Sequence, residues 1–336
     1  MSIVLAYKNF AARRNVSHIG LGVAAINTAK VLQRDGMPTE VWPVVSAADL
    51  RQRLERSPRE QVIISAPWIP TLEMQALGND FPTTQFAVTC HSNVGFLQAD
   101  RNGVKLVREL MGLEMATTNV HLAGNTMRFC HWIIQAFNAP CAYLPNLYYL
   151  GAQIPPLRHP FKYGTLRIGA FGATRPLKNL MSAAAAALEI ARRLRVPLEF
   201  WVSAGRTEGG GDTVLSAVSE MLQGLPDVTL KLNTWQTWPE FRKTVANMHL
   251  LLQPSYTESF NMVTADGVAE GVASVVSSAI DWAPSDWKAD VDDVPQIARA
   301  GRKLLSDMHA PQEGYQALAT YVANGLTAYK QYFAIR

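Results

Sequence analysis

The stretch from 250 to 278 carries the residues best suited to chemistry, because the acids Glu258 and Asp266 follow an apolar run there. Glu258 and Asp266 lie eight positions apart. If a helix begins just after Glu258, the two carboxylates stand about two turns apart and face one crevice. Unpaired N–H groups at such a helix start bind anions, helped by the helix dipole. This layout would suit a sugar nucleotide, with one acid on sugar hydroxyls, the amides on phosphate and the other acid on ribose. The candidate residues here are Glu258, Ser259, Phe260, Asn261, Met262, Val263 and Asp266.

A pair of cations follows another apolar run, in the sequence FGATRPLKN (171–179). Arg175 and Lys178 stand where a helix is predicted to begin. Cations oppose the dipole at that end of a helix, so a bound phosphate accounts for them better than simple solvation does. A guanidinium binds phosphate through two parallel hydrogen bonds, and an ammonium binds it as a compact charge. We therefore expect Arg175 and Lys178 to neutralise a diphosphate.

The candidates in the first half are His91, Gly20 and Gly22. His91 ends the predicted strand 84–92, and a lone histidine in that place is more often structural than catalytic. Gly20 and Gly22 belong to HIGLG (18–22), which is typical of a tight turn where the backbone can approach a phosphate or a sugar. This glycine turn does not follow its strand directly, so a dinucleotide-binding fingerprint is not indicated.

Predicted strands and helices alternate along the chain, and these elements must position the candidates. Repeated alternation favours an α/β fold with parallel sheets and helices on both faces. In the first half, strands are predicted at 2–8, 39–45, 61–66 and 84–92 and a helix at 21–36, with helical or polar stretches such as 46–57 between the strands. In the second half, strands at 165–173, 198–204, 228–233, 249–255 and 273–278 alternate with helices at 178–195, 213–225 and 259–271.

A proline-bearing stretch with Pro155, Pro156 and Pro160 separates the two halves, because proline ends helices and interior strands. We expect an N-terminal domain over 1–154 and a second domain over 155–312, with a ligand cleft between two such α/β units. The segment 313–336 places apolar residues on one face of a helix, and that face must pack on another surface.

The composition excludes several classes of protein. With 336 residues, 48% of them hydrophobic and 17% charged, the chain can fill a core and is not disordered. A net charge of +4 is too small to indicate a nucleic-acid or membrane partner. Cys90, Cys130 and Cys141 lack metal-ligand spacing, so no metal site is expected and a reducing compartment fits. Without a signal-peptide pattern or a spanning apolar run, we expect a cytoplasmic protein with no integral membrane contact.

The sequence PSYTESFNMVTADGVAEGVASVVSS (254–278) resembles the signature of the retaining glycosyltransferases of family four, also called glycosyl transferases group one. That signature runs Pro-Ser, two residues, Glu-Gly-Phe-Gly, a few apolar residues, Glu-Ala, and a small-Gly-small-Pro-Val-Val string. Glu258 matches the first acid and Asp266 the second. The departures are Ser259 and Asn261 for two glycines, an aspartate for the second glutamate, and Ala273-Ser274 where the family has a residue followed by proline.

Two loops elsewhere extend this resemblance. Lys178 matches the family lysine that clamps the donor diphosphate. The family arginine of that loop falls on Ala173, and Arg175 is its candidate replacement. FAVTCHSN (86–93) resembles a strand-end Thr-x-His of the N-terminal domain, so the resemblance implies that His91 contacts the donor sugar.

The first half matches more diffusely. HIGLGVAAINTAKVLQRDGMPTEV (18–41) resembles the opening glycine loop and helix of the family, with Met37 in place of a histidine. LPNLYY (144–149) stands where the family has an interdomain Pro-Asn-Gly element, with Leu147 for the glycine.

The resemblance implies a GT-B fold with two Rossmann-like α/β/α domains and a C-terminal helix that crosses back to the N-terminal domain. It also implies retaining transfer of a glucose-like hexose from a nucleoside diphosphate sugar, a UDP-sugar by preference, without a metal or other cofactor. Arg175, Lys178 and the amides of 260–263 would neutralise the diphosphate. Glu258 would hold the sugar, and Asp266 the ribose.

The acceptor and the class of function stay open. A saccharide or another small molecule offers the required hydroxyl. A hydroxymethylated base in DNA offers one too, and this viral alternative would place the protein in the host cytoplasm. The departures from the signature also fit a protein that binds a nucleotide sugar without turning it over.

Overall fold

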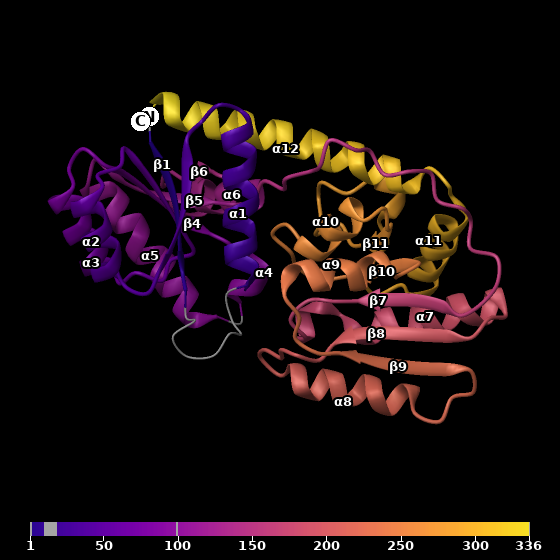
Figure 1. The fold of residues 1–336 in the computed structure, drawn as a ribbon. Coiled ribbons are helices and arrows are strands. Elements are labelled where there is room, and N and C mark those ends of the chain that lie inside the picture. The colour runs from indigo at the N-terminus through magenta and orange to yellow at the C-terminus, as the bar shows by residue number, and fades with distance from the viewer. Residues whose placement is uncertain (1, 10–18, 99, 336) are drawn as a thin grey trace. The chain divides into compact units, whose positions relative to one another are not determined.

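The computed structural model describes residues 2–9, 19–98 and 100–335. The chain divides into two compact units, and Figure 1 follows them by colour along the chain. Unit 1 comprises Met1–Tyr149 with Val322–Arg336, and unit 2 comprises Leu150–Tyr321. We expected a division after 154, and the compact units divide after Tyr149, just before the proline-bearing stretch.

Unit 1 is built on a six-stranded parallel sheet with the order β2-β1-β3-β4-β5-β6. Its central strands are buried along their whole length, as expected for a parallel sheet covered on both faces. Figure 1 shows α2, α3 and α5 on one side of this sheet and α1 on the other. The strands are β1 (Ile3–Lys8), β2 (Thr39–Val44), β3 (Gln61–Ser65), β4 (Gln85–Cys90), β5 (Val120–Gly124) and β6 (Ala142–Tyr143). The helices are α1 (Ile19–Arg34), α2 (Ala47–Arg56), α3 (Thr71–Asp80), α4 (Val94–Leu97), α5 (Arg101–Ala116) and α6 (Met127–Phe137).

Side-chain caps determine where several of these helices begin. Ser46 accepts a hydrogen bond from the N–H of Asp49 before α2, and Thr126 accepts one from Phe129 before α6. Such caps replace the partners that the first N–H groups of a helix lack. The start of α6 follows β5 after only two residues, so the end of β5 is held firmly in place.

Unit 2 contains a five-stranded parallel sheet with the order β11-β10-β7-β8-β9. The first strand of the unit, β7, lies between β8 and β10, so the strand order reverses between β7 and β10. Ligands of open α/β sheets bind beyond the carboxyl ends of the strands at such a reversal. The strands are β7 (Leu166–Ala170), β8 (Leu198–Ser203), β9 (Val228–Asn233), β10 (Leu250–Gln253) and β11 (Ser274–Val276). The helical elements are η2 (Pro176–Lys178), α7 (Leu180–Leu194), α8 (Gly211–Leu222), α9 (Trp238–Ala246), α10 (Met262–Ala269), η3 (Ser285–Trp287) and α11 (Val294–Ser306).

The alanine run of α7 serves close packing. Ala183, Ala184, Ala186 and Ala187 are fully buried, because their small side chains allow the helix to approach its neighbours. Helix α11 comes equally close, since a Cβ at Gly301 would lie 2.6 Å from Ile190 Cδ1 of α7. The two parallel sheets and their helices confirm the predicted fold class.

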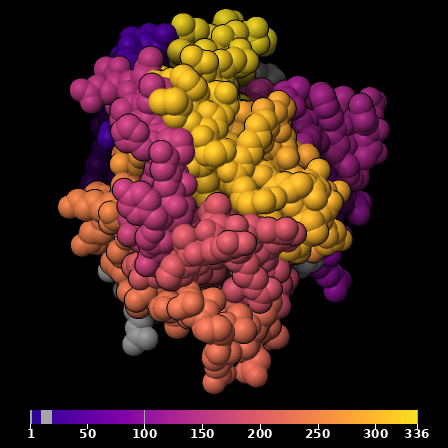
Figure 2. Space-filling view, turned by 90° about the vertical axis from the view of Figure 1, so that its right-hand side faces the viewer, coloured from indigo at the N-terminus to yellow at the C-terminus, as the bar shows by residue number. Residues whose placement is uncertain are grey.

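The segment that links the two sheets runs along α11 and the start of α12 (Ala310–Ile335). The N–H of Arg158 donates to Met308 O at 3.1 Å, and that of Phe161 donates to Leu305 O at 2.9 Å. Figure 2 shows the magenta and pink atoms of this segment beside the yellow atoms of the C-terminal helices. Among the described helices, none is both long and apolar enough to cross a membrane.

Candidate functional site

The candidate residues of unit 2 gather at the point where its strand order reverses. Strand β7 ends at Ala170 and leads through Gly172 to η2, which contains Lys178. Strand β10 ends at Gln253 and leads to the loop that contains Glu258. Both loops leave the carboxyl ends of neighbouring parallel strands, so they meet at the same edge of the sheet.

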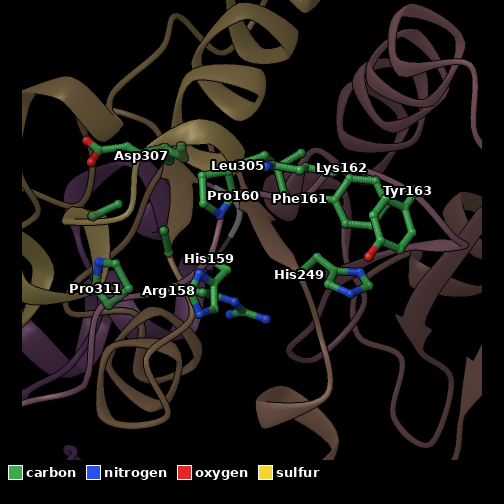
Figure 3. A pocket seen from close by; sticks show the side chains of 13 residues that line it. Arg158, His159, Pro160, Phe161, Lys162, Tyr163, His249, Leu305, Asp307 and Pro311 are labelled. Carbon is green, nitrogen blue, oxygen red and sulfur yellow. The ribbon is translucent and has the colours of Figure 1, made fainter.

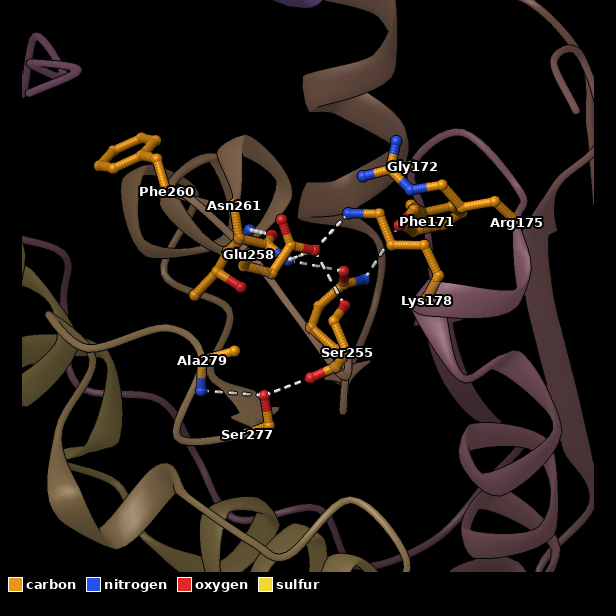
Figure 4. A network of polar contacts seen from close by, with 12 residues as sticks. Phe171, Gly172, Arg175, Lys178, Ser255, Glu258, Phe260, Asn261, Ser277 and Ala279 are labelled. Carbon is orange, nitrogen blue, oxygen red and sulfur yellow. Dashed lines mark hydrogen bonds and ion pairs between the residues drawn. The ribbon is translucent and has the colours of Figure 1, made fainter. Parts of the chain in front are cut away.

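Glu258 is the centre of a polar network at this edge (Figure 4). Its Oε1 atom accepts hydrogen bonds from Ser255 Oγ at 2.9 Å and from Asn261 Nδ2 at 3.1 Å. Lys178 Nζ forms an ion pair with the same oxygen. Glu258 is only 8% exposed, so its charge depends on these partners rather than on water. The structure therefore brings together Lys178 and Glu258, which the sequence assigned to phosphate and to sugar.

Burial and neighbouring charges act on Glu258 in opposite directions. Burial alone would raise the pKa of its carboxyl group. The charge and hydrogen bond of Lys178, the charge of Arg175 and the Ser255 hydroxyl lower this pKa, and the net result lies below the ordinary value. Glu258 is therefore a carboxylate at neutral pH and accepts hydrogen bonds.

Asn261 holds the Glu258 loop in shape. It has φ +63°, a left-handed conformation that asparagine tolerates better than most residues other than glycine. Asn261 Nδ2 also donates to Gln253 Oε1 at 3.2 Å, and Asn261 Oδ1 accepts from the N–H of Thr264 at 2.9 Å. Asparagine thus replaces a family glycine at a position where the backbone needs a positive φ, and it adds three hydrogen bonds.

The helix after Glu258 begins later than predicted. We expected a start just after Glu258, but α10 begins at Met262 because Asn261 caps it. Phe260 lies outside the helix, is 2% exposed and packs on Trp282 with a ring separation of 5.6 Å. Met262 and Val263 form the first helical turn, where N–H groups have no acceptor within the helix. Of the amides at 260–263 that we expected to bind an anion, those of Met262 and Val263 lie at the start of α10.

Arg175 lies near Lys178 but has a partner of its own. Its Nη1 atom donates to Glu208 Oε2 at 2.9 Å, and Arg206 forms an ion pair with the other carboxylate oxygen of Glu208. Neither Arg206 nor Glu208 was a candidate in the sequence. Both lie far from Arg175 along the chain, so only the pairing of β7 with β8 reveals them.

Gly172 forms the turn after β7 beside which the Lys178 side chain lies. Its φ of +112° favours glycine, and a Cβ at this position would lie 3.4 Å from Lys178 Cε. The N–H of Gly172 donates to Ser203 Oγ at 3.2 Å, which fixes the turn to β8. Figure 4 shows the Lys178 and Arg175 side chains reaching the same region above this turn.

Asp266 lies on the buried side of α10 and is 1% exposed. Its Oδ1 atom accepts a hydrogen bond from Trp238 Nε1 at 2.9 Å. Arg242 lies over the Trp238 ring at 5.4 Å and pairs with Glu270 at 2.6 Å. The sequence did not indicate this pairing of Asp266 with an indole N–H.

The histidine of unit 1 lies directly after β4 and is partly buried. His91 Nε2 lies 2.9 Å from Ser65 Oγ, at the end of β3, and His91 Nδ1 lies 3.2 Å from Asn125 Nδ2, just after β5. Burial lowers the pKa of His91 to about 4. Sequence reasoning missed Ser65 and Asn125, although both lie at strand ends of the same sheet.

The expected glycine turn is wrong in detail. Helix α1 begins at Ile19, so Gly20 and Gly22 lie within its first turn rather than in a loop. A Cβ at Gly22 would lie 3.1 Å from the Tyr7 ring, whereas a Cβ at Gly20 would have no neighbour within 4 Å. Gly22 thus serves the contact of α1 with β1. The residues between β1 and α1, from 10 to 18, lie outside the described part of the chain.

A cavity of about 480 Å³ lies elsewhere in unit 2 (Figure 3). It is lined by Arg158, His249 and the turn between α11 and α12, near the amino ends of β7 and β10. Arg158 donates to the carbonyls of Met248 at 2.5 Å and of Gly271 at 3.2 Å, so it ties two loops together. This cavity therefore lies at the opposite end of the strands from Glu258. Within the described residues, no group of three or more His, Cys, Asp or Glu side chains could hold a metal ion.

The two parallel sheets, with helices on their faces, have the GT-B fold. Solved structures share this fold with the chain. An α,α-trehalose-phosphate synthase (UDP-forming) from Burkholderia xenovorans, in complex with glucose-6-phosphate, has a TM-score of 0.64 and 11% identity, with 99% of each chain covered.

Two other structures are similar to a comparable degree. A mutant of S. aureus TarM, in complex with fondaparinux, α-GlcNAc-glycerol and UDP, has a TM-score of 0.61 and 13% identity. That likeness covers 86% of this chain and 58% of TarM. The N-terminal domain of a Candida albicans trehalose-6-phosphate phosphatase has a TM-score of 0.65 and 9% identity, with 97% of each chain covered. No protein-family model and no curated protein matches the sequence. At these identities the likeness shows the fold.

Proposed function

We propose that this chain is a glycosyltransferase that binds a nucleoside diphosphate sugar in unit 2 and transfers the sugar to an acceptor hydroxyl. The observation that carries this proposal is the Lys178–Glu258 ion pair, with Arg175 close by, at the strand reversal of a GT-B sheet. The pair offers cations for phosphate and an ionised acid for hydroxyls within one network. The trehalose-phosphate synthase and the TarM structure support the proposal through their shared fold.

Lys178 and Arg175 would stabilise the leaving diphosphate. Negative charge grows on the phosphate oxygen as its bond to the sugar breaks, and cations held beforehand at that point lower the barrier. The Lys178 ammonium has three hydrogens, so it can bind Glu258 and a phosphate oxygen together. The N–H groups of Met262 and Val263, at the start of α10, would also stabilise the negative charge of the diphosphate.

Glu258 would hold the donor sugar. As a carboxylate it accepts hydrogen bonds from sugar hydroxyls, and its hydrogen bonds to Ser255 and Asn261 keep it oriented. Asp266 is proposed for the ribose hydroxyls, which would then compete with the Trp238 indole for its carboxylate. His91, in unit 1, is proposed as a further hydrogen-bond donor to the sugar.

We propose that the reaction retains the configuration of a glucose-like hexose and needs no metal ion. The acceptor oxygen forms a bond to the anomeric carbon as the bond to the leaving phosphate breaks. The acceptor proton passes to the leaving phosphate oxygen, and a nucleoside diphosphate departs. Uridine is the proposed base, supported by the UDP named with the similar structures.

The proposed acceptor is a saccharide or a sugar phosphate. Glucose-6-phosphate and a GlcNAc-glycerol accompany the similar structures, and both offer sugar hydroxyls. Nothing in the described residues or in the comparisons favours a modified DNA base.

Thermal unfolding with UDP-glucose, UDP-GlcNAc and GDP-mannose tests donor binding. A donor present at a hundred times its dissociation constant adds about 2.7 kcal/mol to the free energy of unfolding. Release of UDP in the presence of glucose-6-phosphate, glucose or glycerol then tests transfer. Lys178→Met should reduce turnover by about tenfold or more, the loss expected for one charged contact to the leaving group.

A matched control separates this site from a general effect of charge. Lys303→Met removes a cation from an exposed ion pair with Asp286 in the same unit, and turnover should not change. Full activity of both Lys178→Met and Glu258→Gln would refute the site. Tight donor binding with no release of UDP under any acceptor would instead favour a binding protein without turnover.

A further inference from the structure

Three residues from the ends of neighbouring strands form a chain of hydrogen bonds in unit 1. Ser65 ends β3, His91 follows β4 and Asn125 follows β5, and these strands are adjacent and parallel. His91 Nε2 lies 2.9 Å from Ser65 Oγ, and His91 Nδ1 lies 3.2 Å from Asn125 Nδ2. The carboxyl ends of such strands are where α/β proteins place functional groups.

The donors and acceptors of this chain have one consistent direction. An amide nitrogen can only donate, so His91 Nδ1 accepts from Asn125 Nδ2 and carries no hydrogen. The single ring hydrogen of a neutral imidazole then lies on Nε2, and it points to Ser65 Oγ. With the Asn125 amide nitrogen toward the ring, the geometry favours the Nε2–H tautomer, whose hydrogen Ser65 Oγ accepts.

The same contacts disfavour a charged His91. Protonation of His91 Nδ1 would place its hydrogen opposite an amide hydrogen of Asn125. Two donors would then face each other without an acceptor. The partners of His91 in the described structure, Ser65 and Asn125, are uncharged. Burial acts in the same direction and lowers the pKa of His91 to about 4.

The surroundings hold this arrangement rigidly. Asn125 is fully buried, and its N–H donates to Cys90 O at 3.1 Å. Its Oδ1 atom is buried with no hydrogen-bond partner in the described structure, a cost that neighbouring contacts must offset. Ala66, next to Ser65, has φ +70° and is fixed by a 3.0 Å hydrogen bond to Thr89 O. Strain and an unpaired buried amide oxygen are tolerated where a functional geometry demands them.

We propose that Asn125 and Ser65 are positioning residues that fix His91 as a neutral donor through Nε2–H. This inference rests on the proposed function, in which His91 meets a hydroxyl or ring oxygen of the sugar. The Nε2 hydrogen bond passes from Ser65 Oγ to the sugar oxygen when the donor binds. His91 then orients the sugar, and the acceptor proton goes to the leaving phosphate rather than to the imidazole.

Nitrogen NMR of the whole protein tests the tautomer without any activity. Ring ¹⁵N shifts of His91 should show a bare Nδ1 and a protonated Nε2 from about pH 5.5 to 8, because the folded pKa lies below this range. Asn125→Asp replaces the donor with a carboxylate, so the hydrogen should move to Nδ1 and the titration should rise into this range. Ser65→Ala should leave the tautomer unchanged, which keeps the test available if the aspartate variant does not fold. A hydrogen on Nδ1 in the unaltered protein overturns the proposal.

Kinetics then separate positioning from a merely structural role. Asn125→Asp should lower kcat about tenfold, equivalent to one hydrogen bond, and should add a pH dependence near neutrality that the unaltered protein lacks. Asn102→Asp, on the exposed surface of α5, is the matched control and should change neither the tautomer nor kcat. A moved hydrogen with unchanged kcat and pH profile refutes the positioning role.

The failure of each idea is distinguishable. If no nucleotide sugar binds or turns over, the proposed function fails, while the NMR spectra still report whether Asn125 sets the tautomer. If transfer is found and Lys178→Met lowers it, but Asn125→Asp keeps full kcat, the proposed function stands and this inference fails.

Discussion

Lys178 and Glu258 lie 80 positions apart and form one buried ion pair between the loops that leave β7 and β10. Their side chains are 16% and 7% exposed, so neither charge is well solvated without the other. Each residue therefore keeps its partner in place before any ligand arrives. The pair couples the stability of the unit to the chemistry proposed for it.

This coupling predicts an asymmetric loss of stability. Lys178→Met leaves a buried carboxylate without its main counter-charge and should lower the free energy of unfolding by about 3 kcal/mol. Glu258→Gln keeps hydrogen-bonding capacity and should cost less. Urea unfolding of both variants and of the double variant should give a coupling energy above about 1 kcal/mol. The exposed Lys303–Asp286 pair is the control, and its coupling should be smaller because water screens both charges. Equal coupling in both pairs would contradict the buried role.

Gly172→Ala should be destabilising because of its backbone. A φ of +112° is unfavourable for any residue with a Cβ, although the added atom would meet Lys178 Cε at an ordinary contact distance of 3.4 Å. We expect a loss of about 2 kcal/mol in the free energy of unfolding. Gly112→Ala, in the middle of α5 with no atom within 4 Å of the added Cβ, should instead be neutral or stabilising. Melting temperatures of the two variants, compared directly, check this difference in sign.

Asn261 caps α10 with a left-handed backbone, so glycine should replace it at less cost in stability than alanine does. Asn261→Gly keeps the positive φ but loses the side-chain hydrogen bonds, and Asn261→Ala loses both. The alanine variant should be less stable than the glycine variant by about 1 kcal/mol. Denaturant midpoints at equal slope provide the measurement. The reverse order would mean that the left-handed backbone at this position costs little.

Acid should weaken the fold through two histidines. Burial lowers the pKa of both His91 and His249 to about 4, from an ordinary value of 6.5, and for His249 the charges of Arg167 and Arg158 add to the effect. The folded state thus prefers neutral rings, while the unfolded state takes up protons below pH 6.5. As the pH drops from about 6.5 to 4, the free energy of unfolding should fall by up to about 3 kcal/mol for His91, and by less for the half-buried His249. His249→Gln should reduce that slope in denaturation measured at successive pH values. An unchanged slope would show that His249 titrates normally.

Trp238→Phe should cost stability through Asp266. The variant keeps the aromatic ring over which Arg242 lies but removes the N–H that donates to the buried carboxylate. The loss of one hydrogen bond to a buried charged acceptor costs about 2 kcal/mol. Trp235→Phe is the control, because Trp235 is 43% exposed. Calorimetric unfolding of the two variants should differ by this amount, and equal melting temperatures would exclude a structural role for the indole N–H.

The fold was predictable because its signal is local and repeated. Alternating strands and helices in both halves, with prolines between them, indicated two parallel α/β sheets, and the topology confirms them. The loop from Pro254 to Asp266 was recognisable because its residues are contiguous. The start of α10 was misplaced, since the left-handed conformation of Asn261 does not show in a hydrophobic pattern.

The partners of the site residues could not be read from the sequence. Glu208 beside Arg175, Trp238 beside Asp266 and Asn125 beside His91 come from distant parts of the chain. Their contacts depend on strand order, and a single sequence carries no direct signal for which strands become neighbours. Gly20 and Gly22 show the opposite error, because their spacing indicated a loop and the backbone is helical.

The last helix gives the two units a different order of completion during synthesis. Unit 2 is one uninterrupted stretch, Leu150–Tyr321, whereas unit 1 draws on the earliest residues and on Val322–Arg336. From that last stretch, Tyr329, Tyr332 and Phe333 are buried. Domains generally fold as units as the ribosome releases them. Unit 1 is therefore translated first but completes its folding last. The apolar surface that Tyr329, Tyr332 and Phe333 cover stays exposed until the final turns of α12 are synthesised.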